Sequence, residues 1–193
     1  MSVAPVDAVR HYLEEILPLY RERFGEDQSV QAFRVFMASH TNLTSRRNLA
    51  GHVTGSALVW HRSSNSFLRV YHAKLNLWVF SAGGHIDEGE LPHDASIREL
   101  REETGLTATP LFDFKKPMPF IVTAHPIPVS IKKAEPAHWH YDLVYLFAVD
   151  QKPVIDADPT EVSQFRWVEG TEITLKNSPV DLSAQMLRYG YEI

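Results

Sequence analysis

Three glutamates at helical spacing are the residues of this chain best suited to chemistry. Glu99, Glu102 and Glu103 occupy positions i, i+3 and i+4 within residues 95–104, a stretch without glycine or proline. A helix there would gather three carboxylates on one face, where their repulsion requires a compensating cation. Carboxylate oxygens so placed suit Mg²⁺ or Mn²⁺, which complete their coordination with water and substrate phosphate. The pattern predicts metal-assisted chemistry on a phosphate compound.

Other residues lie at fixed offsets around the glutamates. The segment that begins at Gly84 reads GHIDEGELPHDASIRELREETGL and contains Glu90, Arg98 and Gly105. A cluster of glutamates alone is often only a solvated acidic face. The glycines and the arginine at these offsets favour a functional site instead. Gly105 is also a predicted C-cap that ends the helix.

This segment resembles the signature of the Nudix hydrolases, the MutT-like family that cleaves nucleoside diphosphates linked to a further group. All fixed positions of the signature are matched. Less specific motifs outside it are similar to an uncharacterised bacterial branch of the family: GHVTGSALVW (51–60), WVFSAGGH (78–85), HPIP (125–128) and HWHYDLVYLF (138–147). One departure is Ala82, because many relatives have proline before the glycine pair.

The resemblance implies a role for each signature residue. Glu102 and Glu103 would be metal ligands, Glu99 a ligand or the general base, and the backbone carbonyl of Gly83 a further ligand for Mg²⁺ or Mn²⁺. The catalytic set would be Glu99, Glu103 and Arg98, with Arg98 orienting the glutamates. Gly84, Glu90 and Gly105 would be structural, and Glu90 would steady the loop expected at the glycine pair Gly83-Gly84. In some relatives the base lies on a late loop, where the candidates are Asp156, Asp158 and Glu161.

Histidines form a second group of candidate residues: His52, His85, His125, His138 and His140. Strand alternation would place His138, His140 and Asp142 on one face, so we expect this face to open onto the same cleft as the glutamates. His85, His138, His140 and Asp142 are candidates to bind substrate. Neutral histidines could instead hold a softer second metal such as Zn²⁺ or Mn²⁺, or serve only as hydrogen-bonded structural residues.

Aromatic residues offer a weaker indication of function. Trp60, Trp78, Trp139 and Tyr141 could stack on a nucleobase, but strand aromatics more often belong to a core or its rim.

Composition narrows the class of protein. The 193 residues, 44% apolar, can bury one sizeable core, and the net charge of −5 with no long basic run argues against binding a nucleic-acid polymer. The absence of cysteine excludes disulfides and thiol chemistry. No apolar run reaches membrane-spanning length, and no signal-peptide core is visible, so we expect a cytoplasmic protein without membrane insertion.

The resemblance implies the layout of the elements that must position these residues: an α/β/α sandwich with a central mixed sheet. The alternation of strand and helix patterns agrees with it. We expect residues 1–48 to form a helical extension packed on the core and 49–193 the Nudix domain. The signature helix should bury Ile97 and Leu100 and point its glutamates outward. The apolar faces of the extension should cover the core or a homodimer partner, and Pro18 should kink or split the first helix. The expected helices are 7–24, 29–39 and 182–189, with Asp27 or Ser29 as the N-cap of the second. The expected strands are 53–61, 67–72, 77–80, 120–125, 140–149 and 165–168.

The function predicted from these features is hydrolysis of a nucleoside diphosphate linked to a further group, such as a nucleotide sugar, a dinucleotide or a nucleoside triphosphate, by attack of water on phosphorus. The first alternative is a silent nucleotide or ligand sensor, although such modules usually lose glutamates that this chain retains. The second is an isomerase of the isopentenyl-diphosphate type, whose common form relies on a cysteine that is missing here.

Overall fold

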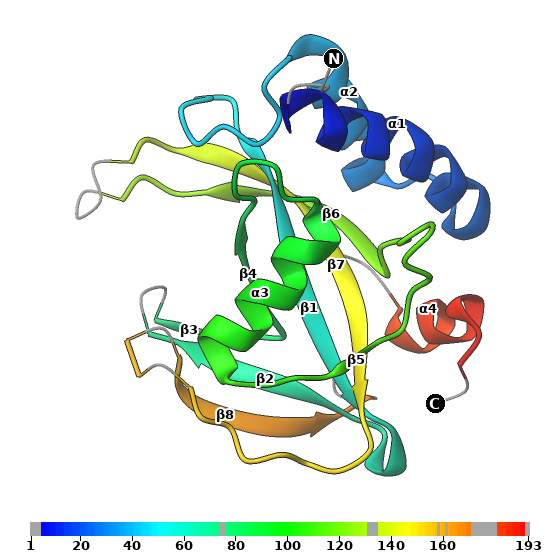
Figure 1. Ribbon diagram of the computed structural model, residues 1–193, viewed down its shortest axis with the longest axis vertical. Helices are drawn as coiled ribbons and strands as arrows, with labels where there is room; N and C mark the ends of the chain where they lie inside the picture. Colours follow the sequence, from blue (N-terminus) through cyan, green and yellow to red (C-terminus); the bar gives the residue numbers. More distant parts are fainter. Residues whose placement is uncertain are drawn as a thin grey trace.

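The protein is described here by a computed structural model that covers residues 5–73, 76–130, 135–157, 159–160, 162–170 and 181–191, with only the backbone of residues 5–7. In this part of the chain, eight strands form one sheet with the order β3-β2-β1-β7-β5, while β4 pairs with β1, β6 with β7 and β8 with β2 (Figure 1). The strands are β1 (His52–His61), β2 (Ser66–His72), β3 (Leu77–Val79), β4 (Ser81–His85), β5 (Thr109–Pro110), β6 (Ile121–Ile127), β7 (His138–Val149) and β8 (Val162–Glu169).

The sheet is mixed because β1 and β7 run parallel while their other neighbours run antiparallel. The helices are α1 (Pro5–Phe24), α2 (Gln28–Ser39), α3 (Pro92–Thr104) and α4 (Leu182–Tyr189). The predicted cap Asp27 accepts a hydrogen bond from the Val30 amide at 2.8 Å, and Gly105 ends α3 with a positive φ of 70°. Pro18 lies inside a continuous α1, so the prediction that it could split the helix is wrong.

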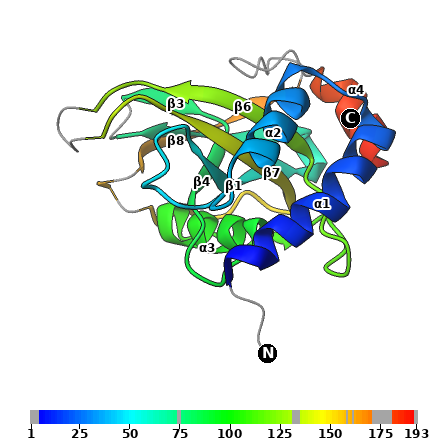
Figure 2. The same cartoon turned by 90° about the horizontal axis from the view of Figure 1, so that it is seen from above.

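Two apolar clusters lie on opposite faces of the sheet, and the helices cover them. Ala95 and Leu100 of α3 join the cluster shared with α1 and α2, whereas Leu182 and Met186 of α4 join the other. Figure 2 shows α3 on one side of the sheet, and α1 passing beside α2 and α4. The α/β/α sandwich is therefore confirmed. None of the helices in the described ranges combines the length and the apolar character needed to cross a lipid bilayer.

Candidate active site

Arg98 connects the acidic residues of the signature. Its Nε and Nη2 donate to the two carboxylate oxygens of Glu90 at 3.0 and 2.9 Å, and its Nη1 donates to Glu99 at 2.8 Å and to Glu102 at 3.0 Å. Nη2 also donates to the backbone carbonyl of His85 at 2.8 Å. The hydrogen bonds with Glu90 are the largest reason why the pKa of Arg98 is raised. One cation thus holds three carboxylates and the end of β4 together.

Glu90 also fixes the loop before α3. Its carboxylate accepts the Asp87 amide at 2.9 Å as well as the two bonds from Arg98. Burial acts to raise the pKa of Glu90, but these hydrogen bonds together outweigh it, so the net pKa is lowered. The side chain stays ionised and can hold the loop against α3.

Glu99 lies directly against the glycine pair. A methyl group on Gly84 would overlap the Glu99 carboxylate, so only glycine lets β4 approach the helix here. Burial raises the pKa of Glu99 despite the opposing hydrogen bond from Arg98. The glycine pair was expected in a loop, but Gly83 and Gly84 lie in β4, opposite Ser56 and Gly55 of β1. The close approach is therefore one of strand to helix.

Glu103 is buried, contrary to the expectation that all three glutamates point outward. Its exposed fraction is 6%, whereas the side chain of Glu102 is 60% exposed. Glu103 shares a helical stripe with Ser96 and Leu100, and that stripe packs against the sheet. Ile97 is only partly buried. The acidic residues therefore extend from the inner to the outer face of α3.

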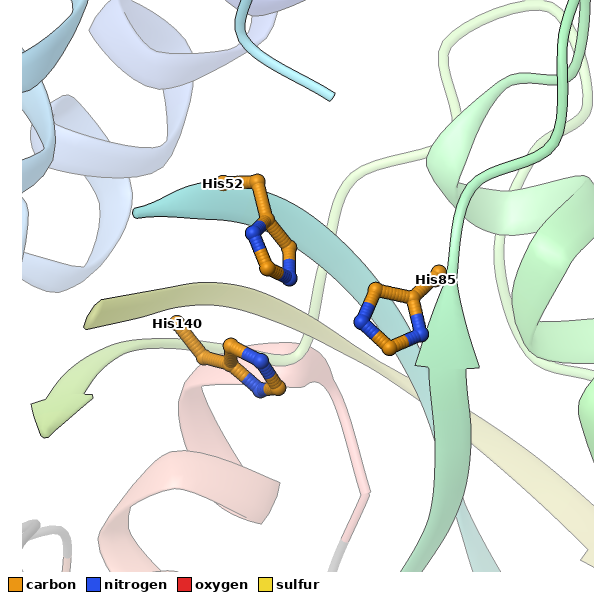
Figure 3. Close-up of side chains that lie close together, drawn as sticks. All are labelled: His52, His85 and His140. Carbon is orange, nitrogen blue, oxygen red and sulfur yellow. The ribbon is translucent and has the colours of Figure 1, made fainter. Parts of the chain in front are cut away.

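Histidines of three strands meet at the other face of the sheet. His52 of β1, His85 of β4 and His140 of β7 place one ring nitrogen each within 4.8 Å of one another, and Figure 3 shows their rings converging. The centroid of the His138 ring lies 5.0 Å from that of His52. Burial is the largest cause that lowers the pKa of His52, to about 4, and the neighbouring His85 is the second. Burial likewise lowers the pKa of His140 to about 2, with His52 as the second cause. The rings of His52 and His140 are therefore neutral at pH 7.

The pairing register separates these histidines from the glutamates. His52 lies opposite His140, and Thr54 lies opposite His85, so their side chains share one face. Gly84 and Gly55 belong to the alternate face, towards α3. The sheet register thus gives no support to a shared cleft, and substrate binding by His85, His138 and His140 stays a prediction. The hydrogen bond from Arg98 to the His85 carbonyl links the two groups.

Asp142 is buried below the histidines. Its Oδ1 accepts hydrogen bonds from the hydroxyls of Thr54 and Ser56, both at 2.9 Å, and burial raises its pKa. Through these two hydrogen bonds the Asp142 side chain links β7 to β1. A direct role in substrate binding stays a prediction.

The remaining candidates divide between core and surface. Tyr141 is buried and stacks on Phe36 with a centroid distance of 4.1 Å, and Trp60 is also buried, so both are core residues rather than platforms for a base. Trp139 is 43% exposed. Of the late-loop candidates, exposed Asp156 lies against Gly105 at the end of α3. Asp158 and Glu161 lie outside the described residues.

The NUDIX domain model matches residues 48–188. This match covers well over half of the chain, so the protein belongs to the Nudix family, whose members are hydrolases of phosphoric anhydride bonds. An RNA pyrophosphohydrolase of Erythrobacter litoralis is 32% identical over 114 residues, which is 54% of this chain and 66% of the relative. A probable DHNTP pyrophosphohydrolase of Lactococcus lactis is 28% identical over 131 residues, covering 66% of this chain and 72% of the relative.

Solved structures with a similar fold carry related descriptions. A hydrolase of the Nudix family from Clostridium perfringens has a TM-score of 0.48 and 19% identity, over 72% of this chain and 95% of that one. The E. coli dihydroneopterin triphosphate pyrophosphohydrolase has a TM-score of 0.47 and 14% identity, over 62% of this chain and 81% of that one.

Proposed function

We propose that the protein is a divalent-metal-dependent pyrophosphohydrolase that cleaves a nucleoside diphosphate linked to a further group, with water attacking phosphorus. The observation that carries the proposal is the arrangement of Glu99 against Gly84, with Arg98 bonded to Glu99, Glu102 and Glu90. Glu99 and Glu102 are hard oxygen donors on one helix, α3, which packs against β4. They fit the coordination preferences of Mg²⁺ or Mn²⁺.

The residues that would hold the ion are Glu99, Glu102 and Glu103, with the carbonyl of Gly83. A bound Mg²⁺ or Mn²⁺ supplies neutralisation of the diphosphate charge and orientation of the attacking water. Arg98 keeps the carboxylates in fixed positions through its hydrogen bonds. Glu99, with its raised pKa, is the first candidate to accept the proton of that water, and Asp156 is the second.

A substrate panel tests the proposed reaction. The purified protein is incubated with Mg²⁺ or Mn²⁺ and with nucleoside triphosphates, dinucleotides, nucleotide sugars or an RNA oligonucleotide bearing a 5′-triphosphate, and the phosphate products are identified. We expect cleavage of an anhydride bond in a small nucleotide. Turnover of the RNA alone would contradict the small-molecule assignment, and the absence of turnover on every compound would favour the silent sensor.

Substitution of Glu103 tests the site. Glu103→Gln keeps the size of the buried side chain but removes its charge, so turnover should fall by about 10²–10⁴ with the fold intact. Turnover is measured at saturating substrate, and circular dichroism checks the fold. Glu88→Gln is the control because Glu88 is exposed in the turn before α3. Near-normal turnover by Glu103→Gln would remove Glu103 from the site.

A further inference from the structure

The three histidines already have much of the geometry of a metal centre. Their candidate ligand atoms all lie within 4.8 Å of one another, on three different strands. Zn²⁺ binds imidazole nitrogen at about 2.0–2.1 Å, which places the nitrogens of a tetrahedral site about 3.4 Å apart. Small rotations of side chains about their χ angles span such a difference. The backbone need not move for the three rings to reach one ion.

His52 supplies an independent indication of a ligand. It is 2% exposed, and both of its ring nitrogens are buried without a hydrogen-bond partner among the described residues. A buried polar group without a partner is costly, and natural structures contain few of them. A metal ion bound at one of these nitrogens would supply the missing interaction.

His138 supports this arrangement from outside the trio. Its Nδ1 donates to the carbonyl of Pro136 at 2.8 Å, so in the neutral ring its Nε2 presents a lone pair. That Nε2 lies 3.2 Å from Nε2 of His140. Metal-binding histidines are commonly fixed by such hydrogen bonds, which set the tautomer and the direction of the ring.

A cavity of about 30 Å³, large enough for one ion or water molecule, is lined in part by His52, His85 and His138. Glu135 also lines it and accepts a hydrogen bond from Arg46 at 2.9 Å. The cavity therefore offers a single small ligand a place beside the rings and a nearby carboxylate.

We propose that His52, His85 and His140 together bind one Zn²⁺ ion, at a site distinct from the carboxylates of α3. Imidazole ligands select Zn²⁺ over Mg²⁺, which prefers oxygen. The ion ties β1, β4 and β7 together at one end. It also fixes His85, whose carbonyl accepts a hydrogen bond from Arg98, so it steadies the strand on which the signature residues rest. This proposal does not depend on the hydrolytic activity.

Zinc binding by protein without a histidine tag tests the proposal. Zinc is removed with a chelator, and Zn²⁺ is then titrated by calorimetry in a large excess of Mg²⁺. We expect one Zn²⁺ per chain, a melting temperature that rises with zinc, and a loss of zinc affinity of at least about 10²-fold in His52→Ala, His85→Ala and His140→Ala. The controls are His11→Ala, which changes an exposed histidine, and Glu103→Gln, and both should keep the wild-type affinity.

Crystals of the wild-type protein give a second readout that does not require the variants to fold. After a zinc soak, an anomalous difference peak measured at the zinc absorption edge should lie between the three rings. No zinc binding at micromolar concentration, wild-type affinity in the histidine variants, or a peak located only at the α3 carboxylates would each overturn the proposal.

Discussion

Arg98 makes more of the site's hydrogen bonds than any single glutamate does. It bonds to Glu90 through Nε and Nη2, and to Glu99 and Glu102 through Nη1. Nη2 also donates to the His85 carbonyl. A planar guanidinium can satisfy this set because its donors point in fixed, divergent directions. The glutamates therefore depend on Arg98 for their positions, and a change at this residue should affect them together.

Replacing Arg98 by lysine keeps the charge but removes this fork of donors. We expect Arg98→Lys to lower turnover by about 10–10²-fold, because Glu99 and Glu102 lose their fixed positions. The free energy of unfolding should fall by about 1–3 kcal/mol, since the partly buried Glu90 loses charge-assisted hydrogen bonds. Turnover and urea denaturation measure the two effects. Arg101→Lys, at an exposed position of the same helix, should change neither.

At the scale of elements, the packing of α3 against β1 and β4 sets how close the Glu99 carboxylate comes to β4. Gly84 faces the Glu99 side chain, whereas Gly55 faces the backbone carbonyl of Pro92 at the start of α3. A side chain can move aside at little cost, but the backbone of a packed helix cannot. The two glycines should therefore respond differently to the same substitution.

Gly84→Ala should lower activity with little effect on stability. The added methyl group displaces the Glu99 carboxylate, so turnover should fall by about 10–10²-fold while the melting temperature changes by only a few degrees. Gly55→Ala should instead act mainly on stability and clearly lower the melting temperature, because α3 must shift. Equal losses of stability in both variants would argue against the contact between Gly84 and Glu99.

Tyrosines attach α1 to the sheet. The Tyr12 hydroxyl lies 2.6 Å from that of Tyr145, and the Tyr20 hydroxyl accepts the Val122 amide at 3.2 Å. Burial raises the pKa of Tyr20 to about 12, although the bond from Val122 acts in the opposite direction. Each of these hydroxyls is therefore held in its neutral form by the packing of the helix on the sheet.

This packing predicts a loss of stability at alkaline pH. Because the folded pKa of Tyr20 lies above the usual value of about 10, its contribution is complete below pH 10 and is lost as the pH rises towards 12. The loss should amount to about 2–3 kcal/mol at most from this residue. Urea denaturation between pH 8 and 12 measures it. Tyr20→Phe should show a shallower decline than the wild type, whereas Tyr71→Phe, at a partly exposed position, should not.

Local patterns in the sequence predicted the elements better than their relative placement. Asp27, Gly105 and the limits of α4 (182–189) follow from caps and periodicity that neighbouring residues determine. The strand assignment of Gly83 and Gly84 depends on β1, almost thirty residues earlier, and could not be read locally.

The sequence indicated only part of the histidine cluster. The H-x-H spacing of His138 and His140 drew attention to β7. His52 was one of the five candidate histidines, but it was not among the residues expected to bind substrate. Its place beside His140 results from the pairing of two strands distant in the chain. Likewise, the burial of Glu103 depends on which stripe of α3 meets the sheet, and three glutamates on one helical face do not reveal this.

At the scale of the whole molecule, α1 and α2 are built into the core. Phe33 is fully buried, and the centroid of its ring lies 5.5 Å from that of Tyr141 in β7. Phe36 stacks on the same Tyr141 ring. Val9, Leu13 and Leu17 belong to the same cluster as Leu143 and Phe147 of the central sheet. The first forty residues therefore cover part of the core directly, whether or not a partner chain also binds there.

Removal of residues 1–40 should expose this apolar surface and give aggregation or a lower melting temperature. Size-exclusion chromatography and thermal unfolding measure the outcome. Phe33→Ala tests the same packing with a single substitution and should lower the free energy of unfolding by about 3–5 kcal/mol. Val35→Ala in the same helix should cost little because Val35 is exposed. A soluble truncated protein as stable as the full chain would show that the helices are dispensable.

The parallel pairing of β1 with β7 also bears on how the chain reaches its fold during synthesis. His52 pairs with His140 and His61 with Val149, so each residue of β1 pairs with a residue 88 positions later in the chain. β2 and β4 can pair with β1 soon after its synthesis, but the edge of β1 that pairs with β7 stays open until most of the protein has been made. Contacts so distant slow folding and prolong the exposure of strand edges. Nascent chains that stop before residue 150 should therefore be the ones most dependent on chaperones.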